Sequence, residues 1–151
     1  MTSVLTKHER RMIARLLFFL LISVTSTVTA KEFSKLIVVH SSYCGHCQHW
    51  ISDVSNALAY DAKSYGINNL PKVQMYDVTE SEAQHEIDNL SKNKVIKKPV
   101  EMIPMFIVVN EKGEEAENCR MVGYSDKEQW YKDLKNLLER CGSEKDSTPQ
   151  E

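Results

Sequence analysis

The sequence has no excess of basic residues, no internal repeats and no long hydrophobic run. Its 19 Lys and Arg residues are offset by 21 Asp and Glu residues, and the formal net charge is −2. Because a mildly acidic chain is a poor match for a phosphate backbone, we expect no nucleic-acid partner. The 151 residues are 42% hydrophobic and 26% charged, which is typical of one globular domain and argues against disorder.

The longest apolar run lies near the N-terminus and is shorter than a membrane span. It covers residues 16–22 and follows a basic segment, whereas a helix that crosses a bilayer needs about 20 predominantly apolar residues. Val28 and Ala30 then place small side chains where a signal peptidase requires them. We predict a signal peptide over residues 1–30, cleaved before Lys31, and no stable membrane anchor; an uncleaved anchor is the alternative.

Two missing signals bear on the destination of the protein. Residue 31 is Lys rather than Cys, which excludes a bacterial lipoprotein anchor at that site. The sequence ends without a retention signal of the Lys-Asp-Glu-Leu type. We therefore expect an exported protein, with the bacterial periplasm favoured over a secretory-pathway lumen or secretion. Disulfides between cysteines persist in each of these compartments.

Apolar patterns predict a single α/β domain over residues 31–142, followed by a flexible polar tail over residues 143–151. Short apolar runs predict four strands, at 36–40, 73–78, 105–109 and about 119–122. Apolar residues three and four positions apart predict three helices, which start near Cys47, Thr79 and Ser125. The resulting order β-α-β-α-β-β-α favours one mixed sheet with helices on both faces, the last two strands being antiparallel.

Capping residues give the predicted ends of these helices. Thr79 with Glu82, and Ser125 with Glu128, match the capping box with which a helix begins. A glycine is favoured just after the last turn because it adopts a left-handed backbone without strain. The predicted end residues are Gly66 for the first helix and Gly142 for the last.

Cys44 and Cys47 lie directly after the first predicted strand, where a helix begins. Two intervening residues on a first helical turn bring the sulfurs within bonding distance. Unpaired N–H groups at a helix N-terminus favour thiolate over thiol, and thiolate is the species that attacks a disulfide. We expect Cys44 to be the exposed nucleophile and Cys47 to be the resolving cysteine. An imidazolium at His46 would stabilise the thiolate and make the disulfide a stronger oxidant; a solvated histidine of little effect is the alternative.

This segment, residues 38–47, resembles the active-site strand and turn of the thioredoxin superfamily, and its Cys-Gly-His-Cys motif matches the form found in protein disulfide isomerases. The segment Ile103-Pro104-Met105 resembles the cis-proline loop that faces the redox pair in that superfamily. The resemblance covers residues 34–140 and implies the thioredoxin fold, with a cis bond before Pro104. It also implies substrate contacts, which would come from Tyr43, Gly45, Ile103 and Pro104.

The sequence departs from the thioredoxin pattern in three ways. Val38 stands where thioredoxins carry a buried acidic residue that helps to move protons for the resolving cysteine. Tyr43 stands where a tryptophan usually precedes the first cysteine, and the first strand and helix of a full-length thioredoxin are largely missing. Together with His46, the change at Val38 favours an oxidase or isomerase over a reductase.

The expected function is that of an exported thiol–disulfide oxidoreductase acting on thiols or disulfides of other exported proteins. It needs no cofactor beyond the Cys44–Cys47 pair, but a redox partner protein must reset that pair. Two other classes use the same residues. His40, His46, His49 and the two cysteines are soft ligands near one turn, which is compatible with a copper or zinc carrier, although we predict no metal there. A non-enzymatic adaptor that keeps the fold for binding is the other alternative.

Two further features remain open at this stage. Cys119 and Cys141 either form a structural disulfide, which would contribute about 2–4 kcal/mol, or leave Cys141 as a small buried hydrophobe. The basic connector over residues 92–99 carries four lysines. It is either a solvated loop or a guide for an acidic partner.

Overall fold

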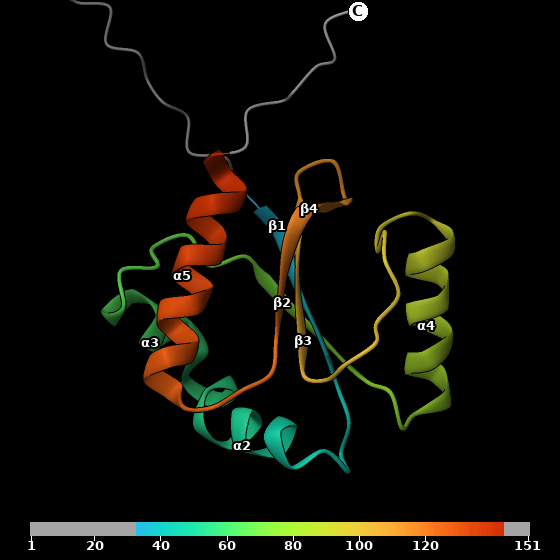
Figure 1. Ribbon diagram of the computed structural model, residues 1–151, viewed down its shortest axis with the longest axis horizontal. Coiled ribbons are helices and arrows are strands. Elements are labelled where there is room, and N and C mark those ends of the chain that lie inside the picture. Colours follow the sequence, from blue (N-terminus) through green and yellow to red (C-terminus); the bar gives the residue numbers. More distant parts are fainter. Residues whose placement is uncertain (1–32, 144–151) are drawn as a thin grey trace, which may run out of the picture. The chain divides into compact units, whose positions relative to one another are not determined.

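The computed structural model describes residues 33–143; the predicted signal peptide and all but the first residue of the predicted tail lie outside that range. Four strands form one mixed sheet in the order β2-β1-β3-β4 (Figure 1). The strands are β1 (Phe33–His40), β2 (Lys72–Asp77), β3 (Met105–Asn110) and β4 (Glu115–Val122). β1 is parallel to β2 and antiparallel to β3, and β3 is antiparallel to β4. The predicted fold class and element order are confirmed.

Helices cover both faces of the sheet. They are α2 (Gly45–Asp53), the 3₁₀ turn η1 (Ser55–Ala57), α3 (Leu58–Ser64), α4 (Ser81–Lys92) and α5 (Lys127–Ser143). Side chains of α2, α3 and α5 pack into one core cluster, whereas α4 packs into a second cluster on the opposite face (Figure 1). None of the helices between residues 33 and 143 combines the length and the apolarity of a membrane span.

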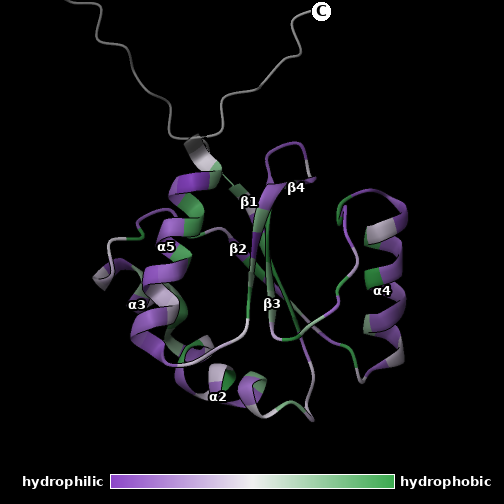
Figure 2. Ribbon diagram, in the orientation of Figure 1, coloured by the Kyte–Doolittle hydropathy of each residue, from purple (hydrophilic) through white to green (hydrophobic). Residues whose placement is uncertain are grey.

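Both faces of the two central strands are covered, and the strands are apolar from Leu36 to Val39 on β1 and from Met105 to Val109 on β3 (Figure 2). On β1, Leu36 and Val38 point into the cluster under α2 and α5, while Ile37 and Val39 point into the cluster under α4. All four side chains are fully buried. Burial of a side chain of this size contributes about 1.5–3 kcal/mol, so these four residues anchor β1 firmly between the two clusters.

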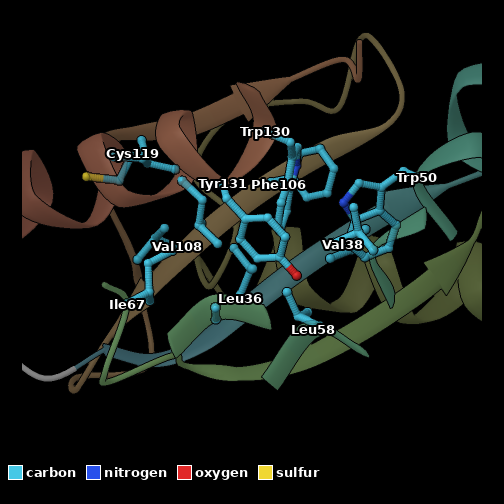
Figure 3. Close-up of a cluster of buried hydrophobic side chains, with 14 of the residues drawn as sticks. Leu36, Val38, Trp50, Leu58, Ile67, Phe106, Val108, Cys119, Trp130 and Tyr131 are labelled. Atoms are coloured by element: carbon cyan, nitrogen blue, oxygen red, sulfur yellow. The ribbon is translucent and has the colours of Figure 1, made fainter. Parts of the chain in front are cut away.

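Aromatic side chains join α2 to the sheet and to α5. The ring of Trp50, on α2, lies 5.2 Å from that of Phe106 on β3 and 5.5 Å from that of Trp130 on α5, between centroids. Figure 3 shows these rings with Tyr131 beside them. Tilted aromatic pairs at this distance add about 0.5–1.5 kcal/mol each to their burial. The helix that starts at the redox pair is thereby fixed to both neighbours.

The first helix is not continuous to Gly66, as the sequence pattern predicted. It stops at Asp53, passes through η1 and resumes as α3. The Ser52 hydroxyl donates to the His49 carbonyl oxygen at 2.9 Å, so this polar stretch competes with the helical hydrogen bonds. The Asp53 carboxylate accepts a hydrogen bond at 3.0 Å from the hydroxyl of Tyr124, which holds the end of α2 beside the segment before α5. Gly66 does follow the end of α3, with φ of +79°.

The capping box predicted at Thr79 is wrong. α4 begins at Ser81, and its N-cap is Glu80, whose side chain accepts no capping hydrogen bond within the described residues. The Thr79 hydroxyl instead donates to the carboxylate of Asp77, at 2.6 Å. A short polar side chain can bond to a nearby carboxylate as readily as to a helix N-terminus, and here the strand end supplies the better partner.

The ends of α5 and of β4 also differ from prediction. The cap of α5 is Asp126, whose carboxylate accepts the Gln129 N–H at 2.9 Å, so the predicted box at Ser125 is one residue early. Gly142 lies inside the helix rather than after it, because α5 continues to Ser143. β4 begins four positions before the predicted start, since polar residues of the hairpin interrupt its apolar pattern.

Cys119 and Cys141 form a disulfide that joins β4 to α5. Both side chains are 1% exposed and belong to the core cluster on the α5 face. The bond connects residues 22 positions apart in the sequence. It therefore closes a loop that contains the whole connection between the edge strand and the last helix.

Replacing both cysteines, Cys119→Ala with Cys141→Ala, is expected to lower the free energy of unfolding by about 2–4 kcal/mol, because the bond restricts the unfolded chain. Urea denaturation of the two oxidised proteins measures the difference. The reduction potential of the Cys44–Cys47 pair, which lies elsewhere in the fold, should stay the same. A double variant as stable as the original protein would show that the bond makes no net contribution.

Candidate active site

Cys44 is the N-cap residue of α2. The turn between β1 and α2 is fixed by Ser41, whose carbonyl oxygen accepts the Cys44 N–H at 3.1 Å and whose hydroxyl accepts the Tyr43 N–H at 3.1 Å. The Cys44 carbonyl oxygen accepts the Gln48 N–H at 3.0 Å, as the first bond of the helix. The backbone at Cys44 is extended, with φ −94° and ψ 114°. The side chain therefore projects over the start of the helix.

The two cysteines of the motif are joined by a disulfide and differ in exposure. Their Cα atoms are 5.2 Å apart. The Cys47 N–H donates to the Cys44 sulfur at 3.2 Å, so the sulfur occupies the place of a capping oxygen. Cys47 is fully buried, whereas Cys44 is half-buried. Of the two sulfurs, that of Cys44 is the one open to attack from outside, and the Cys47 N–H that donates to it would stabilise negative charge there.

The residues around Cys44 leave it accessible. Tyr43 is 90% exposed, and His46 also lies on the surface. A side chain built at Gly45 would meet no described atom within 4 Å. These three residues flank Cys44 in the sequence and are all exposed, which leaves room for a polypeptide to approach.

A loop from another part of the chain faces the pair. The Ile103–Pro104 peptide bond is cis, and the carbonyl oxygen of Ile103 lies 3.9 Å from the Cys44 sulfur. The Pro104 carbonyl oxygen accepts the N–H of Gly123 at 2.8 Å, and Gly123 has φ of +85°. The fold thus brings together the redox turn, the proline loop and the segment before α5, three parts that are distant in sequence.

The proline loop is held by a buried ion pair that the sequence pattern did not reveal. The Glu115 side chain, 3% exposed on β4, accepts the Lys97 N–H at 2.7 Å and pairs with Arg120, with 2.8 Å between Oε2 and Nη2. Arg120 also donates to the Pro99 carbonyl oxygen at 2.7 Å. Residues five apart on a regular strand point to opposite faces, but the positive φ of Asn118, 52°, marks an irregularity that brings both onto one side.

Burial and hydrogen bonding shift the pKa of Glu115 in opposite directions. Burial alone would raise the pKa of its carboxyl group. The hydrogen bond from Arg120 and that from the Lys97 N–H outweigh this effect, so the pKa of Glu115 is lower than usual. The charged form is therefore the one that holds the loop.

A second polar cluster lies at the carboxyl ends of β1 and β2. His40 is 9% exposed, and its Nδ1 lies 3.9 Å from a carboxylate oxygen of Asp77. The other oxygen of Asp77 accepts the Thr79 hydroxyl at 2.6 Å and the Ser42 N–H at 3.3 Å. The bond from Thr79 is the main cause of the lowered pKa of Asp77. This cluster ties the redox turn to the end of the neighbouring strand.

The residues that would form a metal site are not gathered around one point. Within residues 33–143, no group of three His, Cys, Asp or Glu side chains is close enough to hold an ion. His40 points toward Asp77, while His46 and His49 are exposed. Val38, in the position of the missing acidic residue, is fully buried among apolar side chains.

Comparison with known proteins identifies the fold. The sequence matches no protein-family model and no curated protein. The chain is similar to the solved structure of the periplasmic thioredoxin SoxS from Paracoccus pantotrophus in its reduced form, at 17% identity and a TM-score of 0.50 over 70% of this chain and 96% of that chain. It is also similar to a thioredoxin-fold protein from Helicobacter pylori, at 13% identity and a TM-score of 0.50 over 77% and 75% of the two chains. The chain therefore has the thioredoxin fold, with a disulfide-linked Cys-x-x-Cys pair at its first helix.

Glu115→Gln should lower the free energy of unfolding by about 3 kcal/mol at pH 7, because it leaves the charge of Arg120 buried without its partner. Since the folded pKa of Glu115 is lowered, its contribution is present above the unfolded value of about 4.3 and disappears as the pH falls through the folded value. The original and variant proteins should therefore converge in stability in acid.

Urea denaturation at a series of pH values checks this expectation. The matched control is Glu114→Gln, which removes an exposed pair with Lys97, 3.2 Å between the charged atoms, and should change the stability by less than about 1 kcal/mol. A Glu115→Gln deficit that stayed constant from pH 7 into acid would show that the carboxylate charge is not responsible.

Proposed function

We propose that this chain is a thiol–disulfide oxidoreductase that exchanges disulfides with other proteins through Cys44 and Cys47. The observation that carries the proposal is the asymmetry of the pair: the Cys44 sulfur is accessible and accepts a helix N–H, whereas Cys47 is buried behind it. This arrangement gives one cysteine the role of nucleophile and the other the role of resolving group.

In the reducing direction, the Cys44 thiolate attacks one sulfur of a client disulfide. A bond forms between Cys44 and that sulfur, and the second client sulfur leaves as a thiolate. The Cys47 thiolate then attacks the Cys44 sulfur, which forms the intramolecular disulfide and releases the first client sulfur as a thiolate. Two electrons pass from the protein to the client, and a redox partner must return them.

In the oxidising direction, a client thiolate attacks the Cys44 sulfur of the disulfide and displaces Cys47 as a thiolate. A second client thiolate then attacks the client sulfur of the mixed disulfide and releases Cys44. We favour this direction, or isomerisation, because an imidazolium at His46 would stabilise the Cys44 thiolate, and because Val38 offers no proton acceptor for Cys47. No cofactor beyond the pair is required.

The proline loop supports a role in binding the client. The Ile103 carbonyl oxygen stands 3.9 Å from the Cys44 sulfur, so a client chain joined to that sulfur comes within reach of the Ile103 backbone. We propose that this backbone pairs with the client, that the exposed Tyr43 and Gly45 form the adjoining surface, and that the buried Pro104 positions the Ile103 backbone for this contact. The predicted signal peptide supports exported proteins as the clients, with the bacterial periplasm as the favoured compartment.

Cys47→Ala is expected to trap mixed disulfides between Cys44 and its clients, because the resolving thiolate is gone. Non-reducing electrophoresis of cell extracts, followed by reduction of the shifted bands, measures the trapped species. The control is Cys44→Ala with Cys47 intact, which should give few adducts since Cys47 is buried. If Cys47→Ala forms no adducts, the result would support a non-enzymatic binding protein instead of an oxidoreductase.

His46→Ala is expected to lower the reduction potential of the pair by about 20–30 mV, if the imidazolium contributes roughly 1 kcal/mol to the thiolate. Equilibration with glutathione, read by thiol alkylation, measures the potential. His49→Ala, another exposed histidine of the same helix, is the control and should change it less. Equal reduction potentials in the original protein and in His46→Ala would show that His46 is a solvated side chain without effect on the pair. A strongly reducing potential in the original protein would point to a reductase.

A further inference from the structure

One edge of the sheet is open at β2. This strand stands at the end of the order β2-β1-β3-β4, and of the strands that the structure describes only β1 pairs with it. The Val78 N–H, directly after β2, donates to the His40 carbonyl oxygen at 2.8 Å and so faces β1. Because the backbone groups of successive residues in a strand point to opposite sides, those of Gln74 also face β1, whereas those of Val73 and Met75 face outward. Unpaired N–H and C=O groups of this kind are a template for another strand.

The two outward-facing residues also line an apolar groove beside the open edge. Val73 and Met75 belong to its walls, and its apolar part includes Leu58 of α3 with Ile67 and Leu70 of the segment before β2. The groove has a volume of about 630 Å³. Met75 is 39% exposed, so a large apolar side chain remains uncovered at the edge. An apolar concave surface next to unpaired backbone groups favours a strand that carries apolar side chains.

A second copy of β2 matches this edge when it lies antiparallel, with a two-fold axis at Gln74. Val73 of each copy is then opposite Met75 of the other, because the residue numbers of opposite positions have a constant sum. Both residues direct their backbone outward, so each pair is of the hydrogen-bonded type and exchanges both of its N–H···O=C bonds. The side chains of each pair lie on the face of the groove, where apolar side chains opposite each other stabilise a sheet. The edge is therefore complementary to itself in backbone and in side chains.

The charges at the ends of β2 agree with the antiparallel direction. Lys72 begins the strand and Asp77 ends it, and the hydrogen bond from Thr79 lowers the pKa of Asp77, which is therefore charged at neutral pH. In the register above, Lys72 of one copy is opposite Tyr76 of the other and adjacent to its Asp77. The two Lys72 residues are about 13 Å apart along the strands, farther than the Debye length of about 8 Å at physiological ionic strength. Lysines oppose the pairing of edge strands where they meet, and in this register they do not meet.

We propose that two copies of this protein associate through the open edges of β2, antiparallel and with Gln74 at the two-fold axis. The two sheets then continue into each other, and Met75 of each copy lies against the groove of the other. β1 and β2 are parallel, and the redox turn follows the end of β1, so the two redox pairs lie toward opposite ends of the joined strands. The association does not depend on disulfide exchange at Cys44.

A cysteine at the axis tests the register. Gln74→Cys places two thiols opposite each other in a non-hydrogen-bonded pair, with Cα atoms about 4.5 Å apart, which a disulfide can bridge. The background is Cys44→Ala with Cys47→Ala, so that the new thiol cannot exchange with the redox pair. The control is Lys72→Cys, whose two thiols would be about 13 Å apart along the strands.

Both cysteine variants are incubated with oxidised glutathione, and non-reducing electrophoresis measures the covalent dimer. The dimer is expected to form at least about tenfold faster in Gln74→Cys, because its thiols are within bonding distance. Lys72 is exposed and Gln74 only half-exposed, so easier access to the thiol cannot explain this result.

Sedimentation velocity of the unaltered protein, over about 5–500 µM, measures the association without a cross-link. The mean sedimentation coefficient is expected to rise with concentration from that of a monomer to that of a dimer. Met75→Lys places a charge in each apolar pair and is expected to raise the dissociation constant at least about tenfold. The matched control is Met102→Lys, because Met102 is 59% exposed and belongs to the segment before β3, outside the groove. Circular dichroism checks that both variants fold.

A protein that stays monomeric over this range overturns the proposal and leaves the edge to a strand from another protein. A dimer that Met75→Lys and Met102→Lys affect equally places the contact elsewhere and overturns it too, as does a cross-link that forms equally fast at positions 74 and 72. A dimer weakened by Met75→Lys alone, with the faster cross-link at position 74, supports the assignment. If Met75→Lys does not fold, the comparison of the two cysteine variants decides the question.

Discussion

Trp50 holds α2 against the sheet and against α5 through its contacts with Phe106 and Trp130, and the redox pair stands at the start of that helix. The position of the Cys44 sulfur over the helix N-terminus depends on this packing, because the helix can present its N–H groups only where its apolar face is anchored. Cys47, on the same helix three residues before Trp50, is fully buried, while Cys44, one turn earlier, is half-buried. The position of each cysteine on this anchored helix therefore sets the chemical difference between two identical side chains.

The opposite wall of the site is fixed by charge instead. Glu115 and Arg120 bond to the backbone of the connection before Pro104, so a buried ion pair determines the path of the loop that faces Cys44. A buried pair gives little net stability because desolvation opposes it, but it accepts only one arrangement of donors around it. By bonding to the backbone at Lys97 and Pro99, the ion pair holds this surface loop in one conformation.

The redox turn was predictable because it is a contiguous signal, whereas the proline loop was predicted from its resemblance to the thioredoxin superfamily. A strand, two cysteines with two residues between them and a helix are read directly from neighbours in the sequence. The cap at Thr79 was mispredicted because its hydroxyl bonds to the carboxylate of Asp77 instead. The cap at Ser125 was mispredicted because the neighbouring Asp126 accepts the same kind of hydrogen bond. The break after Asp53 was not predictable, since the partner that stabilises it, Tyr124, lies in a distant segment.

By itself the sequence determined the order of the elements, the burial of β1 and the placement of the cysteine pair at a helix start, because local periodicity and backbone chemistry suffice for these. Tertiary structure alone decided which groups meet. The carbonyl oxygen of Ile103 beside the Cys44 sulfur, the bond between Cys119 and Cys141, and the Glu115–Arg120 pair all join residues that a strand or helix period does not relate. An irregularity near Asn118 reverses the facing of side chains along β4, and only the paired strand makes that reversal visible.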